Sequence, residues 1–262
     1  MSSPFYRFFR RLHHPLPWRM YEKLPRLPNY KNEYWDGELR LTPRPKTCDV
    51  LLELPRWAGP PPIPAEDQPL WEAPVRIDRV VEGDWDALPK ALQAAFAALP
   101  PLASWNVHAA ARASRSIMKW SRRGRDGTLV PEACFVARGS GKRYDSEVGD
   151  PLDNVVGAAI VTLIPAAQLP GALDDAVDDG RTGRLVPHLN WLFVNRWLQR
   201  QGIGTLLLHS VVQSLLHADH RWLASTLMLD NAASMLWHWR NGFIMPSDGY
   251  RSLRRARQAG PG

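Results

Sequence analysis

The chain has 262 residues, which is enough for one large domain or for one domain with an extension. Hydrophobic residues make up 45% and charged residues 23%, as in ordinary globular proteins. No apolar run of about 18 residues is present, which excludes a typical transmembrane helix, and arginines interrupt the start where a signal peptide needs an apolar core. We therefore expect a cytoplasmic protein that does not associate with membranes.

The formal net charge of +7 is concentrated at the two ends of the chain. The basic residues at these ends include Arg7, Arg10, Arg11, Arg251, Arg254, Arg255 and Arg257. Because a basic tail is more often a solvated end than a binding arm, this distribution does not favour nucleic-acid binding. The two cysteines, Cys48 and Cys134, fit a reducing compartment and lack metal-ligand spacing, so we expect no metal.

Residues 1–70 are rich in proline, which prevents long helices. Within them, residues 33–41 place Asp36-Gly37 between β-prone residues, and this pattern predicts a β-hairpin. Residues 49–54 favour a further short strand. We expect an N-terminal extension that either packs on the main domain or caps its substrate groove.

From residue 71 onward, hydrophobic periodicity predicts strands mixed with helices. Strands are predicted at residues 75–81, 132–138, 155–164, 185–194 and 222–230, and from residue 242. Helices are predicted at residues 84–99, 104–120, 205–218 and 232–240. This order predicts a mixed α/β domain over residues 71–262, with helices on both faces of a twisted central sheet of six to seven strands and a basic C-terminal tail.

The stretch from residue 191 to residue 205 reads as a strand, a glycine loop and the start of a helix. The loop sequence is Gln199-Arg200-Gln201-Gly202-Ile203-Gly204. Unpaired amides at the start of a helix, next to glycines that let an anion approach the backbone, can form an anion site. The loop lacks both the Gly-Lys-Ser/Thr of a P-loop and the third glycine of a dinucleotide-binding loop.

This loop fits the pattern Gln/Arg-x-x-Gly-x-Gly/Ala and resembles motif A of the GNAT superfamily of acyl-CoA N-acyltransferases. A second motif follows at residues 231–243 and looks like motif B, Asn-x-x-Ala-x-x-Leu-Tyr-x-x-x-Gly-Phe. Asn231, Gly242 and Phe243 are in register with this pattern, and Ser234 occupies the small-residue position. The predicted order of elements is also that of the GNAT fold, and the resemblance covers about residues 71–250.

The resemblance implies that acetyl-CoA or another acyl-CoA binds in an extended form where two strands splay apart. The strand near Phe193 and Val194 would pair with the pantetheine amides, and a backbone N–H near Val194 would stabilise the oxyanion. The start of the helix would hold the pyrophosphate. The implied cofactor-binding residues are Phe193, Val194, Gln199, Arg200, Gln201, Gly202, Ile203, Gly204, Thr205, Asn231 and Ser234.

The candidates for proton transfer depart from the family pattern. The glutamate that many relatives carry four residues before Val194 is Asn190 here, which can bind water or an amine but cannot accept a proton at neutral pH. His188 should face the same side of the strand, so it is a candidate base. His238 replaces the family tyrosine and is a candidate acid for the leaving thiolate. The alternative is a solvated His188 and a His238 packed among aromatic residues.

We expect an N-acyltransferase that moves an acyl group, acetyl in the simplest case, from coenzyme A to the amine of a small molecule or peptide. The alternative is a coenzyme A-binding domain with little or no catalysis, which the missing glutamate and tyrosine favour. A third interpretation, an RNA-associated acetyltransferase, predicts RNA binding that depends strongly on salt. The identity of the acceptor and the choice between a monomer and a homodimer stay open.

Overall fold

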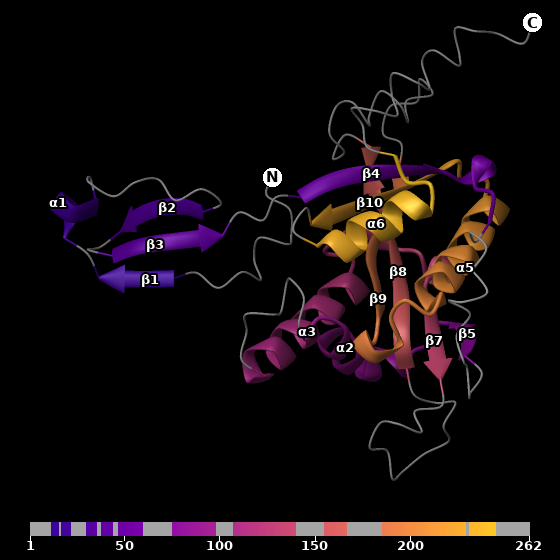
Figure 1. Ribbon diagram of the computed structural model, residues 1–262, viewed down its shortest axis with the longest axis horizontal. Helices are drawn as coiled ribbons and strands as arrows, with labels where there is room; N and C mark the ends of the chain where they lie inside the picture. The colour runs from indigo at the N-terminus through magenta and orange to yellow at the C-terminus, as the bar shows by residue number, and fades with distance from the viewer. Residues whose placement is uncertain are drawn as a thin grey trace, which may run out of the picture.

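The structure is a computed structural model, and it describes residues 12–15, 17–21, 30–35, 38–43, 47–59, 75–97, 107–139, 155–166, 185–228 and 231–244. These residues form a three-stranded sheet near the N-terminus and a seven-stranded sheet with helices on its two faces. Figure 1 shows the smaller sheet lying apart from the larger one. None of the helices in the described part of the chain combines the length and the apolar character that a membrane span requires.

The smaller sheet is antiparallel, with the strand order β1-β3-β2. Its elements are β1 (Leu12–Pro15), the short helix α1 (Trp18–Tyr21), β2 (Tyr30–Trp35) and β3 (Glu38–Pro43). Trp35 pairs with Glu38, so β2 and β3 form a hairpin where the sequence predicts one. The Asp36-Gly37 pair of that prediction lies outside the described residues.

The larger sheet is mixed and has the order β4-β10-β9-β8-β7-β5, with β6 paired to β8. Its strands are β4 (Thr47–Glu53), β5 (Val75–Arg79), β6 (Thr128–Leu129), β7 (Phe135–Gly139), β8 (Val155–Pro165), β9 (Leu185–Val194) and β10 (Trp222–Met228). Only β9 and β10 are parallel, and every other pair is antiparallel. The predicted mixed α/β class and the predicted size of the sheet are confirmed.

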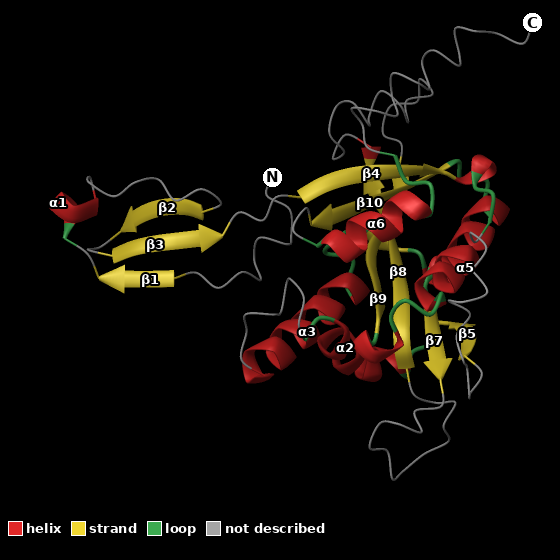
Figure 2. Cartoon of the chain, viewed as in Figure 1, coloured by secondary structure: helices red, strands yellow, loops and turns green. Residues whose placement is uncertain are grey.

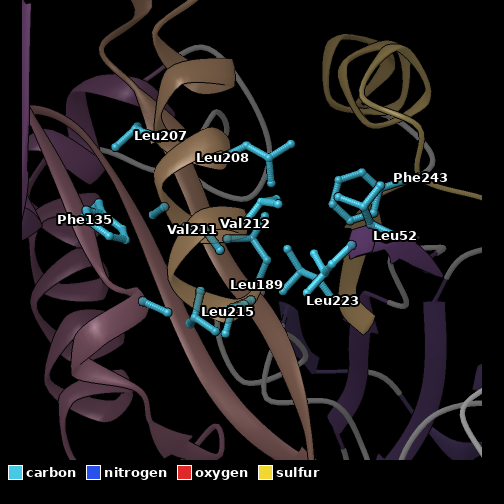
Figure 3. Close-up of a cluster of buried hydrophobic side chains, with 14 of the residues drawn as sticks. Leu52, Phe135, Leu189, Leu207, Leu208, Val211, Val212, Leu215, Leu223 and Phe243 are labelled. Carbon is cyan, nitrogen blue, oxygen red and sulfur yellow. The ribbon is translucent and has the colours of Figure 1, made fainter. Parts of the chain in front are cut away.

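Helices cover both faces of this sheet (Figure 2). They are α2 (Asp84–Ala95), α3 (Val107–Arg122), α5 (Ile203–His217) and α6 (Ala232–Arg240), with short 3-10 turns at Leu54–Arg56, Pro131–Ala133 and Arg196–Leu198. On one face, α2 and α3 pack against β7, β8 and the end of β9. On the other face, the apolar stripe of α5 packs against the sheet, as Figure 3 shows. This stripe consists of Ile203, Leu207, Leu208, Val211, Val212 and Leu215.

The edge strand β4 of the main sheet lies before residue 71 in the sequence. It pairs antiparallel with the whole of β10, from Glu53 opposite Trp222 to Thr47 opposite Met228. The main sheet therefore includes a strand from before the boundary expected at residue 71. The strand expected from residue 242 is, within the described residues, a single bridge between Ile244 and Leu51 of β4. Whether the remaining N-terminal residues cap the domain stays a prediction.

Candidate active site

The parallel strands β9 and β10 separate halfway along β9. They pair only at His188 with Ala224 and at Leu189 with Ser225, although β9 continues to Val194. Figure 1 shows β10 and β4 turned across the direction of β8 and β9. Beyond Leu189, the edge of β9 that faces β10 has no strand partner within the described chain. This is the splay that the sequence predicts.

A β-bulge lies where the two strands separate. The register of β8 against β9 changes between Ile160, which pairs with Trp191, and Val161, which pairs with Leu189. Asn190 is therefore the extra residue of β9. A bulge bends its strand and changes the direction of its side chains. Here it coincides with the position at which β9 leaves β10.

The free edge of β9 presents main-chain groups near Val194. Asn195 N donates to Val156 O at 2.7 Å, so these two residues form a hydrogen-bonded pair of the antiparallel ladder. Because bonded and non-bonded pairs alternate, the next pair, Val194 opposite Gly157, is non-bonded. The N–H of Val194 therefore points away from β8, toward the free edge. Phe193, one of the predicted cofactor residues, instead directs its main-chain groups to β8 and buries its ring on the α2–α3 side of the sheet.

Gly157 permits the close approach of β8 to the end of β9. A Cβ at this position would lie 2.7 Å from Phe193 O and 3.3 Å from Val194 Cα. No such contact is tolerated without movement of the backbone. A glycine opposite Val194 therefore fixes where β9 ends and where the following loop begins.

The loop after β9 folds back toward that end. The Gln199 side chain donates to Val194 O at 3.0 Å, and Asn195 caps the 3-10 turn by accepting from Trp197 N. Arg200 and Gly202 both have positive φ, at 66° and 81°. Gly202 is the N-cap of α5 and has no side chain to cover the helix end. The predicted glycine loop is therefore a tight turn that leads directly into α5.

The first turn of α5 carries unpaired amides. The N–H groups of Thr205 and Leu206 both donate to Gly202 O at 3.0 Å. The amides from Gln201 to Gly204 donate no hydrogen bond to any described residue, and no acidic side chain lies in the first turn. Gly204 lies against α6 and β9, since a Cβ there would approach Trp237 Nε1 to 3.2 Å and Leu192 Cδ2 to 3.3 Å. Bare amides with the helix dipole behind them can bind an anion.

The second motif forms α6, and its residues have structural partners. Asn231 caps the helix by accepting from Ser234 N at 3.1 Å. Gly242 has a φ of 82° and ends the helix, and the buried Phe243 packs against Trp237 and His238. Cofactor contacts from Asn231 and Ser234 stay a prediction, because these side chains already serve the helix.

His238 is buried between α6 and the point where β9 and β10 separate. Its Nδ1 lies 2.7 Å from Ser234 O, and its Nε2 lies 3.0 Å from Ser225 Oγ. Ser225 Oγ also lies 3.3 Å from Leu189 O. Burial lowers the pKa of His238 to about 4, against the raising effect of the hydrogen bond to Ser234. His238 is thus a neutral side chain at neutral pH, which does not favour the predicted role of proton donor.

His188 and Asn190 lie side by side, as the sequence predicts. Nδ1 of His188 contacts Oδ1 of Asn190, and Nε2 of His188 lies 3.0 Å from Thr226 Oγ1. The Thr226 hydroxyl donates to Asp49 Oδ1. Burial lowers the pKa of His188, opposed by the hydrogen bond to Asn190 and by the charge of Asp49. A neutral imidazole at this position can accept a proton.

The network continues on the other side of Asn190. Asn190 Nδ2 donates to Thr162 Oγ1 at 2.9 Å, and Thr162 donates to the main-chain oxygen of Asp126 at 3.0 Å. The Asp126 carboxyl accepts from Ser121 at 3.1 Å and has one buried oxygen without a partner among the described residues. Burial raises the pKa of this carboxyl.

Sequence reasoning missed four residues of this network: Asp49, Asp126, Thr162 and Thr226. No local motif marks them. Asp49 lies in a predicted strand, but its contact with Thr226 spans 177 positions of the sequence. Only the pairing of distant strands brings these side chains together.

No protein-family model matches the chain, and no curated protein matches its sequence. Among solved structures, the chain is similar to a protein from Pyrococcus horikoshii OT3, with 16% identity and a TM-score of 0.45 over 65% of this chain and 89% of that chain. It is also similar to an aminoglycoside N-acetyltransferase in complex with CoA, with 15% identity and a TM-score of 0.42 over 67% and 91% of the two chains. A GCN5-related N-acetyltransferase from Sphaerobacter thermophilus gives 15% identity and a TM-score of 0.45 over 90% of this chain and 56% of that chain.

A further similar structure is described as a putative acetyltransferase of the GNAT family from Desulfovibrio desulfuricans, with 17% identity and a TM-score of 0.39 over 65% of this chain and 86% of that chain. N-acetyltransferases recur among the solved structures to which the chain is similar.

Proposed function

We propose that the protein is a GNAT-type N-acyltransferase that transfers an acyl group, acetyl in the simplest case, from acyl-CoA to an amine. One observation carries the proposal: the free edge of β9 leads, through the loop at residues 195–202, to the bare N-terminus of α5. A strand edge suits an extended chain of amides, and a bare helix start suits a diphosphate. Coenzyme A has these two groups in this order.

In this proposal the pantetheine amides pair with main-chain groups of Leu192 and Val194, which face away from β8. The diphosphate binds the amides from Gln201 to Gly204, where positive φ at Gly202 turns the backbone toward the ligand. The Val194 N–H then lies beside the thioester and can donate to the oxygen that becomes negative during transfer. No metal is needed for any of these contacts.

The reaction requires two protons to leave the acceptor nitrogen. The acceptor arrives as an ammonium and gives the first proton to neutral His188, which becomes an imidazolium. The free amine attacks the thioester carbonyl, the C–N bond forms, and the C–S bond breaks with its electron pair on sulfur. The nitrogen then gives its second proton to the thiolate, directly or through solvent, and His188 releases the first proton to solvent, so charge and atoms balance.

The test of cofactor binding uses calorimetry with coenzyme A on two glycine variants. Gly202→Val places a branched side chain at a φ of 81° and over the amides, so affinity should fall at least about tenfold, or about 1.4 kcal/mol. Gly83→Val is the matched control, because Gly83 is the N-cap of α2 with a φ of −66° and has open space around its Cβ position. Equal affinity in both variants would reject the assignment of the loop.

The test of activity incubates the protein with acetyl-CoA and a panel of small amines and peptides. A gain in amine mass by one acetyl group, with matching release of thiol, is the expected result. Thiol release without an acetylated amine would indicate hydrolysis only.

A coenzyme A-binding domain without catalysis is the second candidate. The position of the family glutamate holds Asn190, and His238 has a pKa of about 4, so neither supplies a charged group at neutral pH. Tight coenzyme A binding with no transfer to any amine of the panel would favour this candidate.

A further inference from the structure

Five polar side chains form a row across one face of the main sheet, the face that α2 and α3 cover. They come from four neighbouring strands: Asp49 of β4, Thr226 of β10, His188 and Asn190 of β9, and Thr162 of β8. Strand register alone brings them together, because Asp49 pairs with Thr226 and Thr162 pairs with His188. The row is continuous, since each side chain hydrogen-bonds to the next.

The direction of the hydrogen bonds at one end of the row is determined by chemistry. An ionised carboxylate only accepts, so the single hydrogen of the Thr226 hydroxyl goes to Asp49. The Thr226 oxygen then has only lone pairs to offer His188 Nε2, which lies 3.0 Å away. Nε2 of His188 must therefore carry a hydrogen.

The other ring nitrogen, Nδ1, contacts the side-chain amide of Asn190, which can bind in either of two orientations. With the Asn190 carbonyl on Nδ1, that nitrogen also donates, and His188 is an imidazolium. With the amide turned over, its N–H₂ group donates to Nδ1, the Thr162 hydroxyl turns from Asp126 O to donate to Asn190 Oδ1, and His188 is neutral. Both arrangements leave the hydrogen on Nε2 in place. The proton that is gained or lost in this site is the one on Nδ1.

We propose that Asp49 is a positioning residue for the base: through the Thr226 hydroxyl it holds the hydrogen on Nε2 of His188, so that Nδ1 takes the proton of the acceptor ammonium. A carboxylate that holds the far nitrogen of a catalytic histidine acts by the same logic in hydrolytic triads. Here a hydroxyl lies between the two groups.

This inference rests on the proposed function and adds that full activity requires Asp49. Asp49 belongs to β4, a strand that precedes the main run of alternating elements. The N-terminal segment thus contributes a residue to the chemistry as well as a strand to the sheet. The charged or titratable groups beside His188 are Asp49, through Thr226, and Asp126, whose main-chain oxygen contacts Asn190.

The test reads the tautomer of His188 directly, by long-range proton–nitrogen NMR of the ring in the full-length chain. The wild type should show a hydrogen on Nε2, with His188→Gln assigning the signals. Asp49→Asn and Thr226→Val should give a mixed or Nδ1-protonated tautomer, whereas Thr226→Ser should retain the wild-type signals. Unchanged signals in both Asp49→Asn and Thr226→Val would overturn the proposal, whatever the activity.

Kinetics provide the second readout. His188→Gln should lower kcat about 100-fold, and Asp49→Asn about tenfold, with the KM for acetyl-CoA unchanged. Asp49→Asn should also move the acidic limb of the pH profile of kcat to lower pH, since a negative charge near the imidazolium is removed.

The matched control is Glu53→Gln, on the same strand and the same face, where the carboxylate pairs only with the surface residues Arg56 and Arg221 among the described residues. Glu53→Gln should leave both the tautomer of His188 and kcat unchanged. A fall in kcat equal to that of Asp49→Asn would indicate that Asp49 acts only through the stability of the fold, and it would overturn the proposal. If the wild type shows the expected tautomer but transfers no acyl group, the proposed function fails while the hydrogen-bond assignment stands.

Discussion

Two N-terminal deletions should differ sharply in their effect on stability, because only the longer one removes β4. Deletion of residues 1–45 leaves β4 and its pairing with β10 intact. Deletion of residues 1–59 removes the whole strand and the 3-10 turn that follows it. The buried side chains lost are Val50, Leu51, Leu52 and Leu54, each at most 2% exposed.

The size of the effect follows from these four side chains. Burying one such side chain contributes about 1.5–3 kcal/mol, so their loss removes about 6–12 kcal/mol. A folded domain is stable by only about 5–15 kcal/mol in total. The longer deletion also exposes the hydrogen-bonding edge of β10. We therefore expect the product of the longer deletion to be unfolded or aggregated.

Urea denaturation followed by circular dichroism distinguishes the two chains. The chain without residues 1–45 should unfold cooperatively, with a midpoint close to that of the full-length protein. The chain without residues 1–59 should show no cooperative transition. Leu51→Ala provides a graded version and should cost about 2–5 kcal/mol. A normal midpoint for the longer deletion would refute the assignment of β4 to the core and, with it, any role for Asp49.

Three further predictions concern single side chains. Gly157→Ala places a Cβ 2.7 Å from Phe193 O, so it should lower the free energy of unfolding by about 1–3 kcal/mol in urea titrations and weaken coenzyme A binding. Gly204→Ala should also weaken binding, measured by calorimetry, because its Cβ would approach Trp237 Nε1 to 3.2 Å at the start of α5. The pKa of His238 is about 4 in the fold and 6.5 when unfolded, so stability should be complete above pH 6.5 and fall as pH drops toward 4, by about 3 kcal/mol. His238→Gln should flatten that part of the curve, and an unchanged slope would contradict the buried neutral state.

Local sequence patterns were sufficient to predict most elements of the main domain. Residues 185–194 and 232–240 were predicted as a strand and a helix, and β9 and α6 have these bounds. The glycine loop was also predictable, because all its parts are contiguous and each has a known backbone use. Apolar residues repeat every two residues in a strand and every 3.6 residues in a helix. This repeat is visible in the sequence whichever element packs against the segment.

The position of β4 was not predictable in this way. A short strand near residues 49–54 was expected, but its partner lies in β10, and no local period says which distant strand will pair with it. The two-residue strand β6 was missed because it is too short to show alternation. The polar row was missed for the same reason as β4: its members are each ordinary in their own segment and become neighbours only through register.

The two candidate histidines differ in what surrounds them, and this difference decides which of them can take part in proton transfer. His238 contacts two serines and a carbonyl, and no carboxylate touches it in the described structure, so burial lowers its pKa to about 4 with only the hydrogen bond to Ser234 opposing it. His188 is also buried, but its imidazolium would have Asp49 beyond the Thr226 hydroxyl and the Asn190 carbonyl on its other nitrogen. A histidine that acts as a base must be neutral before it accepts the proton, and its surroundings must stabilise the cation that forms. Of the two histidines, His188 is the one whose charged form a nearby carboxylate, Asp49, stabilises.

The exchange of the family glutamate for Asn190 is then consistent with catalysis. An amide beside His188 can present either its oxygen or its nitrogen, so it follows the protonation of the ring without carrying charge itself. A glutamate at this position would add a second negative charge to a row that already ends in Asp49 and lies close to Asp126, and burial makes uncompensated charge costly. In the proposed mechanism the proton acceptor is therefore displaced by two residues along β9, and the strand that carries Asp49 comes from the N-terminal segment.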